Sequence, residues 1–404
     1  MGRVGGQAGR VYHAAPIRPR ILFVSPRYPY PPWRGDQVRA FHLIKALSGH
    51  AEVRVVTFGE GEDEGEPLPL ADVEVRAVRS RPPSRLRANL RARPSLPGQV
   101  RLFLDTGMAR AVDEEIARWK PDVLHVTLAR MAPYMPARAA FHRHLDLVDS
   151  LALNMRTRAG AHRGPARIAF GVEARLMLAY EARVAASADS CSVVSEADRQ
   201  MPGLEGAAVI PNGVDLDAFR FSAAQERPPV LAFFGNLGYF HNVEPAKFLA
   251  ERVLPLVRER VPGARLRLVG ARPAPAVRRL TELEGVELAA DVPDMAAELN
   301  GAAIAVLPSF SGSGIKNKVL EAFCVGLPVV SNRLGVQGVD GAVAGRHYLA
   351  AEGADGLAAA AAEVLGERAL SHRLAAEAHA LILERYTWER QAERLLELYG
   401  PGRA

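Results

Sequence analysis

The segment with the clearest chemical potential runs from Leu307 to Asn332. An apolar run, expected to be a buried strand, ends at Leu307. The small-residue loop Gly312-Ser313-Gly314 follows, then Ile315, and a helix is expected to begin near Lys316. Small residues let the backbone approach a ligand closely, and the free amides at a helix start lie at the positive end of its dipole. The segment therefore predicts an anion-binding loop.

Two lysines and one glutamate add charge to this predicted site. Lys316 and Lys318 place positive charge beside the loop, and Glu321 is the only acid on the expected helix. A carboxylate in this place suits hydrogen bonds from the hydroxyl groups of a sugar diol. The alternative is a solvated helix face on which Glu321 pairs weakly with Lys318, three residues away.

Two other loops follow apolar runs in the same manner. Gly235-Asn236-Leu237-Gly238 precedes a helix expected over 244–260, and Arg34-Gly35-Asp36 opens an early helix that carries Arg39. Ligands of open α/β sheets bind at the carboxyl ends of the strands, so these loops are expected to face one common site. Arg34 and Arg39 either meet phosphate or cap and solvate the helix, and the sequence favours neither alternative.

Other phosphate and metal motifs are excluded. The Walker A loop needs a Lys-Ser or Lys-Thr pair after its last glycine, and the sequence has none; the glycine-rich stretch 5–9 follows no strand, as a dinucleotide fingerprint requires. Asp215 and Asp217 form an Asp-x-Asp sequence, but within a Pro-Asn-Gly turn. Both cysteines, Cys191 and Cys324, lie in apolar surroundings. We expect no metal and no other cofactor.

The elements that position these loops alternate between strand and helix. Strands are predicted over 20–25, 52–58, 73–78 and 123–126, and the rhythm restarts over 230–234, 265–269, 286–288 and 303–307. This pattern predicts two doubly wound, Rossmann-like α/β domains facing across a cleft. The predicted boundaries are a disordered start over 1–19, an N-terminal domain over 20–212, a C-terminal domain over 213–385, and a tail helix over 386–400 that returns to the first domain.

Composition agrees with a globular protein of two or three domains. Of 404 residues, 49% are apolar and 24% charged. No uncharged apolar run is long enough to span a membrane, and the first twenty residues contain no apolar signal region. A cytoplasmic protein is therefore expected.

Positive charge is concentrated in the first half of the chain. Residues 1–215 carry 30 Lys and Arg against 23 Asp and Glu, and between Arg76 and Arg101 there are eight arginines and no acid. Such a segment attracts phosphates or anionic lipid, which predicts peripheral contact with the inner face of the cell membrane. The alternative is an arginine-rich solvated surface. No nucleic acid partner is expected.

Several of these segments together resemble family 4 retaining glycosyltransferases. The resemblance rests on Val-Ile-Pro-Asn-Gly-Val-Asp at 209–215, the Phe-Gly-Asn loop at 234–236, and Gly-Ile-Lys-Asn-Lys-Val-Leu-Glu-Ala at 314–322, and it covers roughly residues 20–398. Val-Asp-Ser at 148–150 and Tyr-Glu at 180–181 are similar to sugar transferases of exopolysaccharide and exosortase loci. The resemblance implies the GT-B fold and transfer of a sugar from a nucleoside diphosphate donor, with a UDP-sugar expected, to a saccharide, lipid-linked or small-molecule acceptor.

The resemblance also implies roles on the donor side. Glu321 is similar to the second glutamate of the family's Glu-x7-Glu motif, which holds the donor ribose. Ser313 stands where the first glutamate is expected, so backbone amides of residues 313–315 are left to hold the donor there. Lys316 is expected to replace the family's basic pair at the diphosphate. The Asp291-Val292 pair is similar to the loop that contacts the base.

Two residues of the first domain are candidates for the chemistry. The stretch Asp-Val-Leu-His ending at His125 is similar to the family's histidine motif, with Thr127 in place of a second histidine. The alternative is that His125, as a lone histidine at a strand end, is a packed core residue. Asp149, at another strand end, is the rival candidate. Two other functions stay open: a nucleotide-sugar epimerase of related fold, and a non-catalytic protein that binds a nucleotide sugar.

Overall fold

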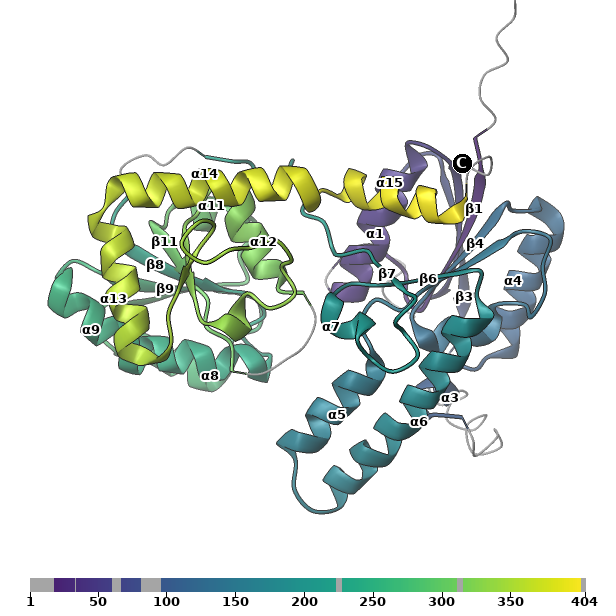
Figure 1. The fold of residues 1–404 in the computed structure, drawn as a ribbon, viewed down its shortest axis with the longest axis horizontal. Helices are drawn as coiled ribbons and strands as arrows, with labels where there is room; N and C mark the ends of the chain where they lie inside the picture. Colours follow the sequence, from purple (N-terminus) through teal and green to yellow (C-terminus); the bar gives the residue numbers. More distant parts are fainter. Residues whose placement is uncertain are drawn as a thin grey trace, which may run out of the picture.

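The computed structural model describes residues 18–32, 34–59, 67–80, 96–222, 227–310 and 315–400. They form two α/β units side by side, each built around its own parallel sheet (Figure 1). The prediction of two doubly wound domains is confirmed. The predicted disordered start lies outside the described residues up to residue 17.

The N-terminal unit contains a seven-stranded parallel sheet in the order β3-β2-β1-β4-β5-β6-β7. Its order reverses between β1 and β4, so the carboxyl ends of these two strands form a switch point at which such sheets bind ligands. The central strands are continuous apolar runs because helices cover both faces. The strands are β1 (Arg20–Ser25), β2 (Glu52–Gly59), β3 (Val73–Arg79), β4 (Val123–Thr127), β5 (His142–Asp146), β6 (Ser190–Val193) and β7 (Ala208–Val209).

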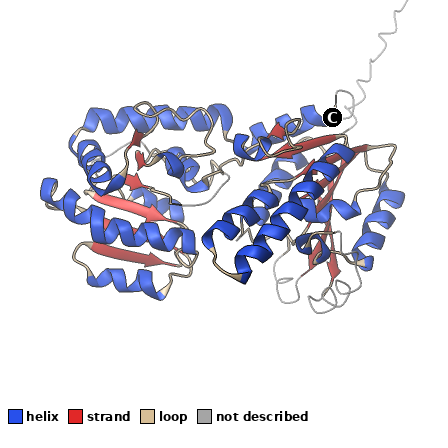
Figure 2. Ribbon diagram, turned by 60° about the horizontal axis from the view of Figure 1, so that its bottom comes forward, coloured by secondary structure: helices blue, strands red, loops and turns tan. Residues whose placement is uncertain are grey.

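Two helices of the N-terminal unit, α5 and α6, pack as an antiparallel hairpin that projects from the body (Figures 1 and 2). The first turn of α5 lies at the carboxyl end of the sheet, next to the C-terminal unit. The helices of this unit are α1 (Gly35–Ser48), α3 (Gly98–Arg101), α4 (Thr106–Trp119), a 3₁₀ helix (Ala129–Tyr134), α5 (Leu151–Ala161), α6 (Pro165–Ser187) and α7 (Glu196–Arg199).

The C-terminal unit repeats this plan with a six-stranded parallel sheet in the order β10-β9-β8-β11-β12-β13. Its switch point lies between β8 and β11, the strands that precede the two glycine loops. Its strands are β8 (Val230–Phe234), β9 (Arg265–Gly270), β10 (Val286–Ala290), β11 (Ile304–Val306), β12 (Val329–Ser331) and β13 (Leu349–Ala350). Its helices are α8 (Phe240–Phe248), α9 (Leu254–Arg260), α10 (Pro275–Arg278), α11 (Met295–Asn300), α12 (Asn317–Cys324), α13 (Gly353–Gly366) and α14 (Arg368–Arg385).

The helix predicted over 244–260 differs from that prediction. It begins at Phe240, and a π-helical turn over Leu249–Val253 separates α8 from α9. Pro245 lies inside α8, at its sixth residue, where its missing N–H leaves one helical hydrogen bond unmade. The earlier start brings residues 239–242 to the edge of the cleft.

The chain returns to the N-terminal unit through its last helix. The helix α14 runs along the C-terminal unit, and α15 (Trp388–Tyr399) continues in the same direction onto α1 (Figure 1). Trp388, Leu395 and Tyr399 are buried in the core that α15 shares with α1 and β1. The ring of Trp388 stacks on His42, with ring centroids 5.2 Å apart.

The strand β5 is polar, and the apolar pattern of the sequence did not predict it. Its His144 and Asp146 are fully buried. Hydrogen bonds join His144 to Ser190 and Ser192, at 2.7 and 3.0 Å, and Ser192 donates to Asp146 at 3.0 Å. Buried polar groups are tolerated when they are hydrogen-bonded, so a network replaces the apolar contacts here.

Candidate active site

Three adjoining cavities lie at the carboxyl ends of the strands, between the two units. The arginine cavity, of about 420 Å³, is lined by residues that include Arg27, Asp36, Arg130, Asp149, Arg158 and Asn212. The lysine cavity, of about 320 Å³, includes Asp149, Arg158, Tyr239, His241, Lys316 and Lys318. The tyrosine cavity, of about 580 Å³, includes Arg27, Tyr28, Tyr30, Arg34, Asn236 and Asp291.

The first glycine loop needs glycine because two strand ends touch there. A Cβ atom on Gly270, which follows β9, would lie 1.7 Å from the carbonyl oxygen of Gly235, and both residues have positive φ. Asn236 fixes the next turn: its Oδ1 accepts from the amide of Gly238 at 3.0 Å, and its carbonyl accepts from Asn242 at 2.8 Å. These two bonds define the shape of the loop, and Asn236 lines the tyrosine cavity.

Lys318 is held in place by its surroundings. Its ammonium group donates to Asn242 Oδ1 at 2.7 Å and lies 4.5 Å from the ring centroid of Phe233. Burial lowers the pKa of Lys318 to about 8, and burial also lowers the pKa of the neighbouring Lys316. Burial and the charges of Lys316 and Arg158 lower the pKa of His241. The lysine cavity therefore gathers positive charge that an anion would stabilise.

Glu321 lies one turn into α12, close to these lysines. Burial raises the pKa of Glu321 to about 7, and the charge of Lys318 opposes that rise. Among the described residues, Glu321 makes no hydrogen bond and no ion pair, and the Lys318 ammonium donates to Asn242. The alternative of a Glu321–Lys318 pair on a solvated face is therefore wrong, and the carboxyl group is available to a ligand.

The second glycine loop cannot be placed. Gly312, Ser313 and Gly314 lie outside the described residues. Ile315, which is described, packs against a small cluster of Leu128, Val148 and Val194 from the N-terminal unit. Ile315, the first described residue after this loop, is thus a point of contact with the first domain.

Asp149 lines both the arginine and the lysine cavity. It is half-buried, and burial together with the charge of Asp198 raises the pKa of Asp149 to about 6. Asp198 accepts from the amide of Ser150 at 3.0 Å, and Glu181 accepts from the amide of Leu151 at 2.7 Å and from the Ser150 hydroxyl at 2.7 Å. These two buried carboxyl groups fix the start of α5 and hence Asp149.

The backbone before Asp149 is strained. Val148 has φ 63°, and Leu128, at the end of the neighbouring strand, has φ 71°. Branched side chains rarely adopt such angles, and each costs about 1–3 kcal/mol. Hydrogen bonds hold both residues: the amide of Leu128 donates to the Asp146 carbonyl at 2.7 Å, and the amide of Val194 donates to the Val148 carbonyl at 2.8 Å. Strain of this kind is concentrated at functional sites.

His125 does not reach the cleft, so its prediction as a catalytic residue is wrong. It is fully buried, stacks on Phe23 with centroids 4.2 Å apart, and shares a 2.8 Å hydrogen bond with the Tyr399 hydroxyl. Burial lowers the pKa of His125 to about 4, so the imidazole is neutral. The alternative of a packed core histidine is correct.

Arg39 is also a core residue, which excludes it from phosphate binding. Its fully buried guanidinium donates to both oxygens of Asp146, at 2.7 and 3.1 Å, and to Asn212 Oδ1 at 3.1 Å. Although burial opposes it, the charge of Arg39 lowers the pKa of Asp146 to about 2. Asn212 in turn donates to Asn317 at 3.1 Å. Arg39 therefore links β5 to the first turn of α12.

The other residues predicted for the early loop do face the cleft. Gly35 and Asp36 line the arginine cavity, and Arg34 lines the tyrosine cavity. Asp291 and Val292 lie on the opposite wall of the tyrosine cavity, where the Asp291 carboxyl accepts from the amide of Arg272 at 2.8 Å. The tyrosine cavity is thus built from both units.

Sequence reasoning missed the arginines of the cleft. Arg27 and Arg130 come shortly after β1 and β4. Because ligands bind at the carboxyl ends of parallel strands, their positions could have been predicted from the sequence. Arg158 lies on α5, for which no local pattern gave a signal. Asp215, by contrast, accepts from the amides of Asp217 and Ala218, which makes the Asp-x-Asp sequence a turn. Among the residues that the structure describes, no three His, Cys, Asp or Glu are grouped as metal ligands.

The comparisons with known proteins agree with this architecture. A family model described as Glycosyl transferase 4-like domain matches residues 34–213, and one described as Glycosyl transferases group 1 matches residues 228–367. The two parallel-sheet α/β domains and these two matches define the class: the chain belongs to the family 4 glycosyltransferases, which have the GT-B fold.

The individual proteins that this chain is similar to are distant from it in sequence. Glycogen synthase of Mycobacterium tuberculosis is 28% identical over 305 residues, which are 70% of this chain and 69% of that protein. Sucrose-phosphate synthase from Thermosynechococcus elongatus superposes with a TM-score of 0.70 at 15% identity, covering 95% of this chain and 98% of that one. HepE of Anabaena, in complex with UDP-glucose, superposes with a TM-score of 0.65 at 15% identity, covering 94% and 100%.

Proposed function

We propose that this glycosyltransferase transfers a hexose from a UDP-sugar to an acceptor in the arginine cavity, with retention of the anomeric configuration. One observation carries the proposal: Asp149 of the first domain and Lys316 and Lys318 of the second line one cavity. The structure of Anabaena HepE with UDP-glucose, of similar fold, supports the choice of donor.

Each side of the cleft has its own task in this reaction. The unpartnered carboxyl of Glu321 accepts hydrogen bonds from the ribose hydroxyls, and residues 291–292 contact the base. Lys316 and Lys318 stabilise the charge that grows on the departing diphosphate. Asp149 lies between the donor and acceptor cavities, where it orients the acceptor hydroxyl and assists the loss of its proton.

We further propose that the reaction needs no metal, since lysines take the place of a cation at the diphosphate. The test is turnover of UDP-sugars, measured as UDP release with and without EDTA, together with nuclear magnetic resonance of the product's anomeric centre. A retained α-linkage and full activity in EDTA are expected. Activity that requires Mg²⁺ or Mn²⁺, an inverted product, or conversion of the UDP-sugar without an acceptor would contradict the proposal.

Peripheral binding to anionic membranes is proposed for the cytoplasmic enzyme through the arginine-rich segment 76–101. Residues 81–95 lie outside the described part of the chain, and Arg76 pairs with Glu114 at 2.6 Å. No helix among the described residues has the length and apolar character to cross a bilayer. Salt-sensitive sedimentation with anionic but not neutral liposomes is expected. Equal sedimentation with both kinds of liposome would refute the proposal.

A further inference from the structure

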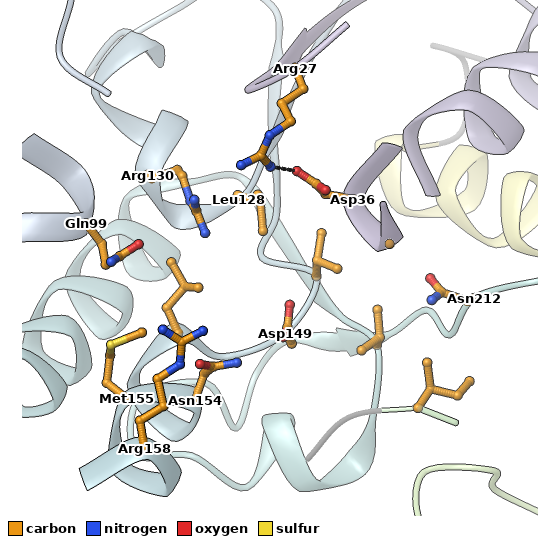
Figure 3. Close-up of a pocket in the computed structure, with 15 residues that line it drawn as sticks. Arg27, Asp36, Gln99, Leu128, Arg130, Asp149, Asn154, Met155, Arg158 and Asn212 are labelled. Carbon is orange, nitrogen blue, oxygen red and sulfur yellow. Dashed lines mark hydrogen bonds and ion pairs between the residues drawn. The ribbon is translucent and has the colours of Figure 1, made fainter. Parts of the chain in front are cut away.

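The arginine cavity contains more positive charge than its own carboxyl groups balance. Arg27, Arg130 and Arg158 line it, against Asp36 and Asp149. Arg27 pairs with Asp36. In Figure 3 the guanidinium groups of Arg27, Arg130 and Arg158 point into the same space, with the Asp149 carboxyl beside it. The cavity thus presents a set of cations arranged around an open volume.

Arg130 is the least compensated of these cations. Its guanidinium lies 4.9 Å from the ring centroid of Phe103, and among the described residues it has no hydrogen-bond or ion-pair partner. The Nε atoms of Arg130 and Arg27 are buried and have no hydrogen-bond partner in the described part of the chain. Burial, followed by the charge of Arg27, lowers the pKa of Arg130. Leaving a half-buried cation without a bonded anion is costly, so the site suits a negative charge that comes from outside.

The donor's diphosphate is not the natural occupant of this cavity. Lys316 and Lys318 line the lysine cavity but not the arginine cavity. Of the three cavities, Arg130 lines only the arginine cavity. Asp149 and Arg158 belong to both. The donor can therefore keep its diphosphate near Lys316, while the second substrate reacts beside Asp149 and places a group of its own near Arg130.

The rest of the wall fits a sugar-sized acceptor. Leu128, Val148 and Met155 form an apolar side, while Asn154 and Gln99 offer hydrogen bonds. A volume of about 420 Å³ is of the size of small-molecule sites. Two guanidinium groups match the several oxygens and the double charge of a phosphate better than the single charge of a carboxylate.

We propose that the acceptor of this enzyme carries a phosphate group, which Arg130 and Arg27 bind in the arginine cavity while the accepting hydroxyl lies at Asp149. This inference rests on the proposed function for the identity of the reaction and adds the chemical class of the acceptor. The phosphate belongs either to a soluble sugar phosphate or to a polyprenyl phosphate, and the experiment separates these two sources.

The test is calorimetric binding of inorganic phosphate to the full chain saturated with UDP. Wild type is compared with Arg130→Gln, Arg130→Lys and, as a matched control, Arg156→Gln; Arg156 is an exposed arginine on α5 that lines none of the three cavities. We expect phosphate to bind wild type and Arg156→Gln equally, Arg130→Gln about 10- to 100-fold more weakly, and Arg130→Lys in between. All four proteins should bind UDP equally, which also shows that they are folded.

The outcomes divide clearly. Absence of phosphate binding to wild type, equal binding to Arg130→Gln, or competition between phosphate and UDP would overturn the proposal. Failure of wild type to bind UDP would instead refute the proposed donor. In a second arm, displacement of phosphate by glucose 6-phosphate identifies a soluble acceptor, and displacement by a polyprenyl phosphate in micelles identifies a lipid-linked one. Displacement by neither would overturn the assignment to an acceptor.

Discussion

Asp149 should make the folded protein less stable as the pH rises, and Asp149→Asn should remove that effect. Burial and the charge of Asp198 raise its pKa to about 6, from a usual value of 3.8. A carboxyl with a raised pKa in the folded state binds its proton more tightly there than in the unfolded chain. Its contribution to stability is therefore present below pH 4 and lost as the pH rises through about 6.

The size of the effect follows from the two pKa values. A difference of about 2.2 pKa units corresponds to at most about 3 kcal/mol at pH 8 and to about 1.6 kcal/mol at pH 5, at 1.36 kcal/mol per unit. Because Asp149 is half-buried, these are upper values. We expect Asp149→Asn to be more stable than wild type, with a gap that widens from pH 5 to pH 8, and to lose most of its turnover.

The assay is urea unfolding followed by tryptophan fluorescence. None of the three tryptophans, at positions 33, 119 and 388, lies within 213–385, so the signal reports on the first domain and the helix packed on it. Asp189→Asn is the control, because hydrogen bonds from Arg143 lower the pKa of Asp189, and its loss should destabilise the protein instead. An Asp149→Asn variant that is destabilised, or stabilised equally at both pH values, would refute the reasoning.

Three further variants test the cleft and its support. Glu321→Ala should weaken UDP binding about 10- to 100-fold in calorimetry through the loss of charge-assisted hydrogen bonds to the ribose, whereas unchanged affinity would remove Glu321 from the donor site. Lys316→Ala should lower kcat more than it raises KM for the donor, since the charge it opposes grows as the diphosphate departs; normal kcat would exclude Lys316 from stabilising the leaving group. Tyr399→Phe should lower the free energy of unfolding by about 1–3 kcal/mol because it leaves His125 Nδ1 without its partner, and an unaltered urea midpoint would argue against the role of that bond.

The buried network around Asp146 explains why two apparently reactive residues serve the fold. Arg39 bonds to Asp146, and His125 lies between Asp146 and Tyr399. Asp146 is three residues before Asp149, and its Oδ1 accepts from the amide of Val148 at 3.2 Å. The network therefore supports the strained turn that presents Asp149. Substitution of Arg39 would therefore alter the position of Asp149 in the cleft, although Arg39 makes no contact with substrate.

The sequence by itself determined the features that are local. Each glycine loop follows an apolar strand and precedes a helix, so the positions of Gly235, Lys316, Lys318 and Glu321 could be predicted from neighbouring residues alone. The alternation of these units also predicted two parallel sheets, because parallel strands need a crossover, most often a helix, between them.

Only the tertiary structure decided which charged residues meet. Arg27, Arg130 and Arg158 are ordinary members of an arginine-rich chain, and they share a cavity because β1 lies beside β4 and β4 beside β5. His125 ends a strand, as a catalytic residue would, yet Tyr399, 274 positions away, covers it. Burial of this kind depends on contacts between distant segments, and these contacts decide whether a charge is a structural partner or remains available to a ligand.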